Sequence, residues 1–447
     1  MSVHAKSSLL PTGWAKDVRV EFSGGKIVSV MTDVSAAPGD ERCDVLLPAM
    51  PNLHSHAFQR AMAGMVETRG PTQDSFWSWR TLMYRFALSM TPDQMEAVAA
   101  QLYMEMLEAG FGRVGEFHYL HHDRDGSHYA NIAELAERIA AAASQTGISL
   151  TLLPVLYAHS GFGGLAPVEG QRRFINAQDS FARLFEGCQK AVSGLAQSVV
   201  GVAPHSLRAV TPEELQFATK LTPNSPLHIH IAEQLKEVED CIAWSGKRPV
   251  EWLLENAEVT DRWCLIHATH MTQQETADVA RSGAVAGLCP ITEANLGDGT
   301  FPASDFLSNG GVLGIGSDSN VLIGVGEELR QLEYSQRLLH HARNVIAPAG
   351  SSTGRSLFDA AVGGGAKALG VKAGIAAGQS ADVVSLDISA APYLTGDHVL
   401  DGWIFGNLVK PNTVWINGRA VVRQGRHVKR EEIARRFQHT MHELLSE

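Results

Sequence analysis

Two histidines one residue apart are the first residues whose types and spacing point to chemistry. His54 and His56 come at the end of an apolar stretch, residues 45–54, that has the composition of a buried strand. Side chains at i and i+2 of a strand point to the same face, so we expect the two imidazoles to lie side by side. Imidazole nitrogens are common ligands of Zn²⁺. The pair therefore supplies half of a metal site, if further ligands reach it.

Three later segments end in side chains of the same kind. They are Leu-His-Ile-His-Ile-Ala-Glu, Cys-Leu-Ile-His-Ala-Thr-His and Val-Leu-Gly-Ile-Gly-Ser-Asp, and their polar residues are His228, His230, Glu233, His267, His270 and Asp318. Four strands that end this way at one rim would bring several imidazoles and a carboxylate together. Such a donor set suits Zn²⁺ or a similar divalent ion, with a position left open for water.

These residues need a scaffold that brings strand ends together. Short apolar runs alternate with longer helical patterns, which is typical of βα units around a parallel sheet. Eight strands are predicted, at residues 45–54, 113–119, 148–157, 198–205, 226–231, 263–268, 284–289 and 312–317. This α/β pattern predicts a (β/α)8 TIM barrel, in which catalytic groups lie at the C-terminal ends of the strands. A doubly wound sheet normally has a glycine-rich loop after its first strand, where this chain has His-Ser-His.

Both ends of the chain have the pattern of a small β-sheet. Residues 17–32 alternate apolar and polar side chains around a Ser-Gly-Gly turn. Residues 381–387 and 413–422 repeat the theme, with a turn at Asn417-Gly418. We therefore expect a composite β-sandwich domain built from residues 1–48 and 376–447, beside a barrel domain of residues 49–375.

The composition limits the classes of partner. Hydrophobic residues make up 45% and charged residues 19% of the 447, as in an ordinary globular protein. A formal net charge of −11 without long runs of Lys or Arg disfavours nucleic acid as a partner. Five scattered cysteines without Cys-x-x-Cys spacing argue against a disulfide framework or a thiolate zinc site. With no apolar signal region and no run of about 18 apolar residues, we expect a cytoplasmic protein with no membrane partner.

Taken together, these features resemble the amidohydrolase superfamily. Two further stretches match it, Gly-Gln-Ser-Ala-Asp-Val-Val at 378–384 and Leu-Cys-Pro-Ile-Thr-Glu-Ala-Asn-Leu-Gly-Asp-Gly at 288–299. Binuclear members bridge two metals with a carboxylated lysine on strand 4, and residues 198–208 contain no lysine, which indicates one metal ion. The mononuclear deaminase branch has a glutamate shortly after the strand 5 histidine, as Glu233 follows His230.

The resemblance implies a role for each strand-end residue. One Zn²⁺ per chain, or another divalent ion, would be bound by His54, His56, His230 and Asp318. The ion would lower the pKa of its water toward neutrality and so provide hydroxide. The catalytic residues would be Glu233, His267 and Asp318. Asp318 takes the proton of the water, His267 orients the nucleophile, and Glu233 protonates the imine nitrogen of the substrate.

Four stretches look like the formimidoylglutamate deiminase family, namely His-Ser-His-Ala-Phe-Gln-Arg at 54–60, Phe-Trp-Ser-Trp-Arg at 76–80, Glu-Phe-His-Tyr at 116–119 and Pro-His-Ser-Leu-Arg at 204–208. In that family the matching positions contact the substrate, and here they are Gln59, Arg80, Tyr119, His205 and Arg208. A small molecule with two carboxylates calls for guanidinium groups, which bind carboxylates in bidentate geometry. The resemblance implies hydrolysis of N-formimino-L-glutamate to N-formyl-L-glutamate and ammonia, in histidine degradation, by a homodimer.

Other interpretations stay open. A purine or other heteroaromatic deaminase of the same branch would share the metal residues and need a flat stacking pocket, which Trp77 and Trp79 would provide. A non-enzymatic scaffold would keep the barrel, but such proteins lose ligands, and all six inner residues are present. Four residues after strand 2 have the side chains of a possible second metal site, but we interpret them as a polar loop; they are His118, His121, His122 and Asp123.

Overall fold

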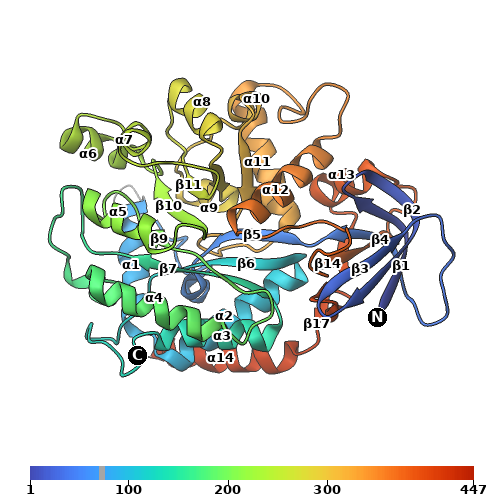
Figure 1. Cartoon of the computed structure of the whole chain (residues 1–447), viewed down its shortest axis with the longest axis horizontal. Coiled ribbons are helices and arrows are strands. Elements are labelled where there is room, and N and C mark those ends of the chain that lie inside the picture. The colour runs from blue at the N-terminus through green and yellow to red at the C-terminus, as the bar shows by residue number, and fades with distance from the viewer. Residues whose placement is uncertain (70–75, 447) are drawn as a thin grey trace.

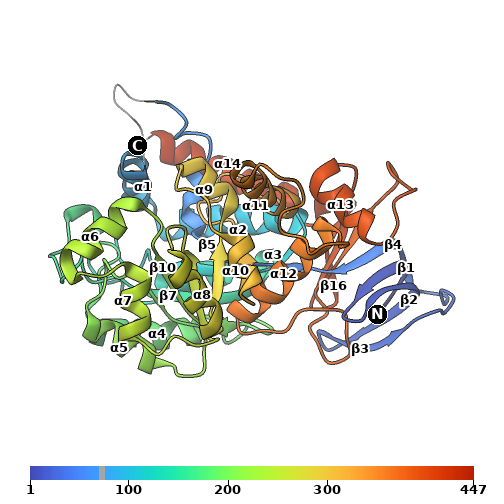
Figure 2. The same ribbon diagram turned by 90° about the horizontal axis from the view of Figure 1, so that it is seen from above.

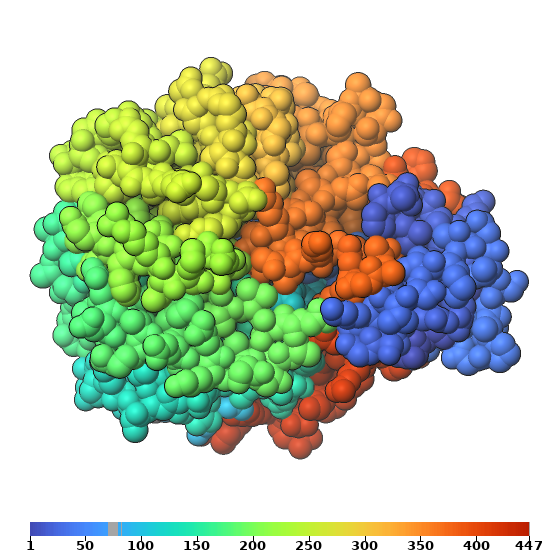
Figure 3. Space-filling model, in the orientation of Figure 1, coloured from blue at the N-terminus to red at the C-terminus, as the bar shows by residue number. Residues whose placement is uncertain are grey.

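The computed structural model of this chain describes residues 1–69 and 76–446, without the side chains of residues 76–78 and 82. A mixed sheet forms one end of the molecule, and two parallel sheets with their helices form the rest (Figures 1 and 2). In the space-filling view, blue N-terminal residues and orange to red C-terminal residues lie side by side at that end (Figure 3). Strands from both ends of the chain therefore pair in one sheet.

The mixed sheet has eight strands in the order β17-β16-β15-β14-β4-β1-β2-β3. Their bounds are β1 (Ser2–Leu10), β2 (Gly13–Ser23), β3 (Lys26–Met31), β4 (Glu41–Pro48), β14 (Val383–Asp387), β15 (Lys410–Ile416), β16 (Arg419–Arg423) and β17 (Arg426–His427). The β2–β3 hairpin turns at Gly24 and Gly25, whose φ values of +57° and +78° favour glycine. Alternate residues such as Val18 and Val20 are buried in an apolar cluster of the sheet's own.

The parallel strands form two sheets that meet at both edges. One has the order β5-β6-β7-β8 with β9 also paired to β7, and the other has the order β10-β11-β12-β13. Isolated parallel bridges join Ser55 to Asp318 at one edge and Val202 to Leu227 at the other, an arrangement consistent with a (β/α)8 barrel. The bounds are β5 (Met50–Ser55), β6 (Phe111–His118), β7 (Ser149–Leu156), β8 (Val199–Val200), β9 (Ala203–Pro204), β10 (Leu227–Ile231), β11 (Trp263–His267), β12 (Val285–Leu288) and β13 (Val312–Ile315).

Helices surround the parallel strands. Thr91 and Thr211 cap two of them, each as a capping box followed by proline, which satisfies free N–H groups of the first turn. None of the described helices is both long and apolar enough to cross a membrane. The bounds are η1 (Ala57–Met62), α1 (Phe76–Ser89), α2 (Pro92–Glu108), α3 (Glu134–Thr146), η2 (Glu169–Gln171), α4 (Gln178–Val192), α5 (Pro212–Leu221), α6 (Leu235–Ser245), α7 (Pro249–Asn256), α8 (Gln273–Ser282), α9 (Pro290–Leu296), α10 (Ala303–Ser308), α11 (Val325–His340), α12 (Thr353–Ala368), α13 (Asp397–Gly406) and α14 (Arg430–Ser446).

The predicted single strand 45–54 is wrong, because the chain changes sheets within it. β4 ends at Pro48 in the mixed sheet, and β5 begins at Met50 among the parallel strands. The N–H of Ala49 donates to the carbonyl of Asp382, which lies just before β14. The N–H of Met50 donates to the carbonyl of Gly110, which lies just before β6. One continuous apolar run therefore supplies a strand to each of two sheets, because its residues are buried in both strands.

The last helix lies away from the mixed sheet. α14 packs along α2 at the foot of the molecule in Figure 1, with ion pairs from Arg436 to Glu96 and from Arg430 to Glu108. The C-terminal residues thus contact both parts of the structure, the mixed sheet through β14–β17 and the parallel part through α14.

Candidate metal centre and active site

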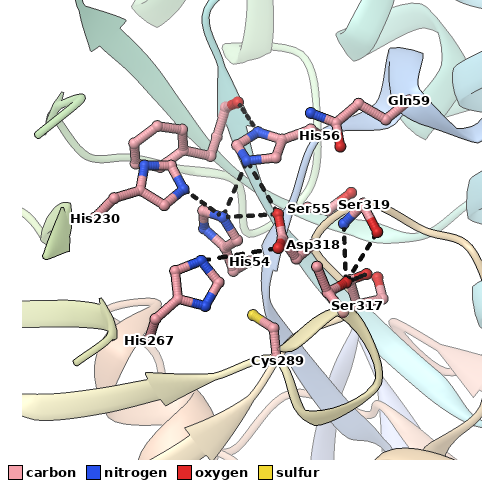
Figure 4. A network of polar contacts seen from close by, with 12 residues as sticks. His54, Ser55, His56, Gln59, His230, His267, Cys289, Ser317, Asp318 and Ser319 are labelled. Carbon is pink, nitrogen blue, oxygen red and sulfur yellow. Dashed lines mark hydrogen bonds and ion pairs between the residues drawn. The ribbon is translucent and has the colours of Figure 1, made fainter. Parts of the chain in front are cut away.

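Three imidazoles and one carboxylate converge at the ends of the parallel strands (Figure 4). Nε2 of His54 lies 3.1 Å from Nε2 of His56 and 3.1 Å from Nε2 of His230. Oδ1 of Asp318 lies 3.5 Å from Nε2 of His54 and 3.2 Å from Nε2 of His56. All four side chains are buried. The strands β5 and β10 and the turn after β13 deliver the four groups to one point.

The other ring nitrogens determine which atoms face this point. Nδ1 of His56 lies 3.0 Å from the carbonyl of Phe117, and Nδ1 of His230 lies 3.0 Å from that of His205. A carbonyl only accepts, so each Nδ1 carries the hydrogen, and Nε2 of a neutral ring presents a bare lone pair. Burial lowers the pKa of His230 well below its ordinary value and that of His54 to about 3. Facing lone pairs beside a carboxylate fit a divalent cation between them.

The turn after β13 is built tightly around this centre. Asp318 and Asn320 adopt φ values of +44° and +59°, which are uncommon outside glycine. Nδ2 of Asn320 donates to the carbonyls of His56 at 3.0 Å and of Asp318 at 2.8 Å, so it clamps two candidate ligands. A Cβ at Gly316 would lie 2.8 Å from the backbone of His54, and only glycine permits that approach. Asn320 was missed in the sequence, although it stands two residues after Asp318.

His267 lies beside the centre and is surrounded by carboxylates. Its Nδ1 is 3.2 Å from Oε1 of Glu293, while its Nε2 is 3.8 Å from Asp318 and 3.9 Å from Glu233. Burial opposes a charge on His267, but the nearby carboxylates of Glu233, Glu293 and Asp318 raise its pKa to about 10. Glu293 belongs to the stretch 288–299 that matches the superfamily, yet no role for it was predicted.

Glu233 follows β10 at the edge of the same pocket. Its side chain is buried, and burial raises its pKa, so this carboxyl holds a proton more readily than an exposed one. Both carboxylate oxygens of Glu237 accept backbone N–H groups, from Ala232 and from Glu233, each at 3.2 Å. This clamp fixes the backbone that carries Glu233. The arrangement is suited to transferring protons next to a metal-activated water.

A pocket lies over the centre, and all five predicted substrate-contact residues line it, Gln59, Arg80, Tyr119, His205 and Arg208. Nε2 of Gln59 donates to the hydroxyl of Tyr119 at 2.9 Å. Burial, with help from Arg208 and Arg80, lowers the pKa of His205 well below its ordinary value, so its ring is neutral. The pocket thus offers two guanidinium groups and several neutral hydrogen-bonding groups.

Arg208 is the unusual member of this set. Its side chain is buried, and it makes no hydrogen bond or ion pair with any residue in the described part of the chain. A buried charge without a partner is costly, and an anion in the pocket would offset that cost.

Other predicted candidates do not join the centre. Nε2 of His228 donates to the carbonyl of Ala368 at 2.7 Å, a buried structural bond whose partner is not one of the centre's four groups. His270 is absent from the metal-binding groups found among the described residues. The same is true of the polar residues after β6, whose His121 and His122 bond the carbonyls of Val155 and Ile175.

Two tryptophans were proposed to form a stacking pocket. Trp79 lines the pocket. The side chain of Trp77 lies outside the described residues.

One cysteine lies unexpectedly close to the centre. Cys289, His267 and Asp318 form a second group of potential ligands, and Figure 4 shows the thiol turned toward the other two. Burial and nearby carboxylates raise the pKa of this thiol well above its ordinary value, which favours the protonated form. All five cysteines are free, in agreement with the predicted lack of disulfides.

Family models match nearly the whole chain. A model described as the amidohydrolase family matches residues 45–421. A second, described as the N-terminal domain of formimidoylglutamate deiminase HutF, matches residues 1–44. The border between the two falls within β4, close to the point where the chain leaves the mixed sheet.

Individual relatives agree with these matches. The chain is 53% identical to formimidoylglutamate deiminase of Pseudomonas aeruginosa, over 99% of both chains. It is 62% identical to a crystal structure titled as an amidohydrolase from Brucella melitensis, with a TM-score of 0.98 over 99% of both chains. An adenosine deaminase from Xanthomonas campestris with bound zinc is 21% identical, with a TM-score of 0.83 over 100% of this chain and 98% of that one, a likeness of fold alone.

Proposed function

This chain belongs to the amidohydrolase family, and we propose on that premise that it is a formimidoylglutamate deiminase. It hydrolyses N-formimino-L-glutamate to N-formyl-L-glutamate and ammonia, and so acts on a C–N bond of a linear amidine. The reaction belongs to histidine degradation. The active site is the pocket over the three-imidazole centre.

The observation that carries this substrate is the unpartnered guanidinium of Arg208, in the same pocket as Arg80. A molecule with two carboxylates supplies an anion for each arginine, and charge-assisted bonds of this kind are the strong ones. A neutral purine ring would leave Arg208 buried and unpaired. The dicarboxylate substrate is therefore favoured over the purine alternative.

We propose one Zn²⁺ per chain as the native metal, held by His54, His56, His230 and Asp318. The bare Nε2 lone pairs support this choice, because three imidazoles and one carboxylate are a donor set that zinc favours. A divalent ion bound there supplies Lewis-acid chemistry that lowers the pKa of water. The remaining chemistry is assigned to side chains of the protein.

Two residues carry the proton transfers, and a third orients the nucleophile. Asp318 takes the proton of the attacking water, and His267, charged through its carboxylate neighbours, holds the nucleophile in place. Glu233, whose pKa burial raises, gives its proton to the imine nitrogen. It then relays the proton of the hydroxyl group on the tetrahedral carbon to the amine, which leaves as ammonia while the C=O bond forms, and the proton held by Asp318 passes to Glu233 to restore the starting state. Gln59, Tyr119 and His205 position the substrate, because their side chains line the pocket beside the two arginines.

The proposal extends to the organisation of the protein. We propose that residues 49–375 form a (β/α)8 barrel domain and that the strands within residues 1–48 and 376–447 form the second, β-sheet domain, which the separate apolar cluster of the mixed sheet supports; α14, within the same residues, packs instead on α2. We expect a cytoplasmic homodimer. Free cysteines suit a reducing compartment, and the net charge of −11 disfavours nucleic acid as a partner. Sedimentation of the purified protein tests the subunit count.

Ammonia release tests the function directly. The protein should release ammonia from N-formimino-L-glutamate and should be far less active on guanine and adenosine derivatives. Higher activity on a purine would contradict the proposed substrate and revive the alternative deaminase.

A further inference from the structure

We propose that the hydroxyl of Tyr157 is a further carboxylate-binding group, which donates its hydrogen to the substrate carboxylate that Arg80 binds. The inference rests on the proposed function, since it needs a substrate with a carboxylate. Tyr157 comes directly after β7 and lines the pocket over the metal centre. The argument starts from the hydrogen bonds around its phenol oxygen.

The oxygen of Tyr157 accepts two hydrogen bonds. Nη2 of Arg80 lies 3.0 Å away and Nε2 of Gln171 lies 2.9 Å away. A guanidinium has donors only. The amide of Gln171 is oriented as well, because its Oε1 accepts the N–H of Val168 at 2.9 Å and so its NH₂ end faces the phenol. Both contacts use Tyr157 as an acceptor, and the hydroxyl hydrogen must point in a third direction.

No residue in the described part of the chain accepts that hydrogen. Tyr157 is only 3% exposed, so bulk water hardly reaches it. The rings of Tyr157 and His205 lie side by side, with centroids 4.4 Å apart. Nδ1 of His205 is already hydrogen-bonded to Oγ of Ser206, at 3.1 Å. A buried hydroxyl that lacks an acceptor costs stability. A ligand oxygen in the pocket would satisfy it.

The neighbouring groups identify the chemistry of that ligand. Arg80 and Tyr157 are linked by a hydrogen bond, so they present one charged and one neutral donor from adjoining positions. A carboxylate has two oxygens that only accept, and it can take bonds from both donors. Gln171 acts as a positioning residue, because its bond holds the phenol oxygen in place without using the hydrogen.

The variant Tyr157→Phe removes the oxygen and keeps the ring. Loss of a hydrogen bond to a charged group should lower kcat/KM for N-formimino-L-glutamate roughly 10- to 100-fold. Metal content should stay at the parent value, because Tyr157 is not among the candidate ligands. The matched control is Tyr334→Phe on α11, which removes a phenol hydroxyl outside the pocket and should leave kcat/KM unchanged.

Two shortened substrates separate binding from a structural role. Formimidoyl derivatives of γ-aminobutyrate and α-aminobutyrate each lack one carboxylate of the parent substrate. With the derivative that lacks the carboxylate bound by Arg80, Tyr157→Phe and the parent protein should have about the same kcat/KM. With the derivative that keeps this carboxylate, Tyr157→Phe should lose as much kcat/KM as it does with N-formimino-L-glutamate. Arg80→Ala, measured with the same pair, identifies which carboxylate that is.

An equal loss with all three substrates, or no loss with any, would overturn the role of Tyr157. A parent protein that releases no ammonia from N-formimino-L-glutamate would instead refute the proposed function. The two failures are therefore distinguishable in one set of assays.

Discussion

Nδ1 of His267 and Oε1 of Glu293 lie 3.2 Å apart, and both side chains are buried. The same Oε1 accepts the N–H of Cys289 at 2.8 Å, which fixes the carboxylate. A carboxylate at Nδ1 keeps the hydrogen on that nitrogen and directs Nε2 toward Asp318 and Glu233. Glu293 does not line the pocket, so it acts on the chemistry through His267.

Glu293→Gln should lower kcat by roughly 10- to 100-fold, because residues that orient an active-site histidine have effects of this size. KM and metal content should change little, since Glu293 does not itself line the pocket and is not one of the four proposed ligands. Steady-state kinetics and elemental analysis measure both. Glu293→Asp, which keeps the charge, should recover part of the loss. An increase in KM with unchanged kcat would instead place Glu293 in substrate binding.

The purified protein should contain one tightly bound divalent ion per chain. His230→Ala should lose this ion, because the variant removes one of the four ligands. The control is His228→Gln on the same strand, which keeps a donor for the carbonyl of Ala368 and should retain the metal. Elemental analysis gives the stoichiometry. Two ions per chain, both needed for activity, would contradict the single site.

Glu233→Gln should keep the metal and lose turnover by roughly 10²–10⁴-fold, the usual contribution of general acid–base catalysis. The amide has nearly the same shape but cannot carry a proton between the imine nitrogen and the leaving amine. Glu239→Gln, an exposed change on the neighbouring α6, is the control and should behave like the parent. Loss of the metal from the Glu233 variant would make that residue a ligand.

Arg208→Ala and Arg80→Ala should each lower kcat/KM by roughly 10- to 150-fold, which corresponds to a hydrogen bond to a charged group of about 1.5–3 kcal/mol. Metal content should not change. Because both arginines bind parts of the substrate away from the reacting carbon, the loss can fall on kcat as well as KM. Arg281→Ala, at an exposed position, is the control. Parent-like kinetics in both pocket variants would remove the physical basis for a dicarboxylate substrate.

The positions of most parallel strands and of the polar groups at their ends were predictable because each depends on local sequence, whereas the assignment of the four ligands came from the resemblance to the superfamily and stays a prediction. Apolar runs and helical periodicity locate the strands, and a strand's C-terminal end locates His54, His230 and Asp318. The division of residues 45–54 between two sheets was not predictable, because the partners of Ala49 and Met50 lie at Asp382 and Gly110, far away in the sequence.

The supporting residues were not predictable for a related reason. Glu293 and Asn320 have ordinary side chains in stretches that were already singled out, and their roles depend on which atoms the fold brings within reach. Tyr157 resembles any aromatic residue at a strand end until its two donors are known. Hydrogen-bond direction is a property of three-dimensional placement, and residue spacing does not encode it.

One residue separates the end of β4 in the mixed sheet from the start of β5, the strand that bears His54 and directly precedes His56. We therefore expect the metal centre and the mixed sheet to be thermodynamically linked through β5. A ligand that binds only the native state stabilises it by mass action. Removing the ion with a chelator should thus lower the melting temperature and also speed amide hydrogen exchange in β1 and β4, although neither strand supplies a ligand. Exchange that accelerates only around β5 and β10 would show that the mixed sheet folds independently of the ion.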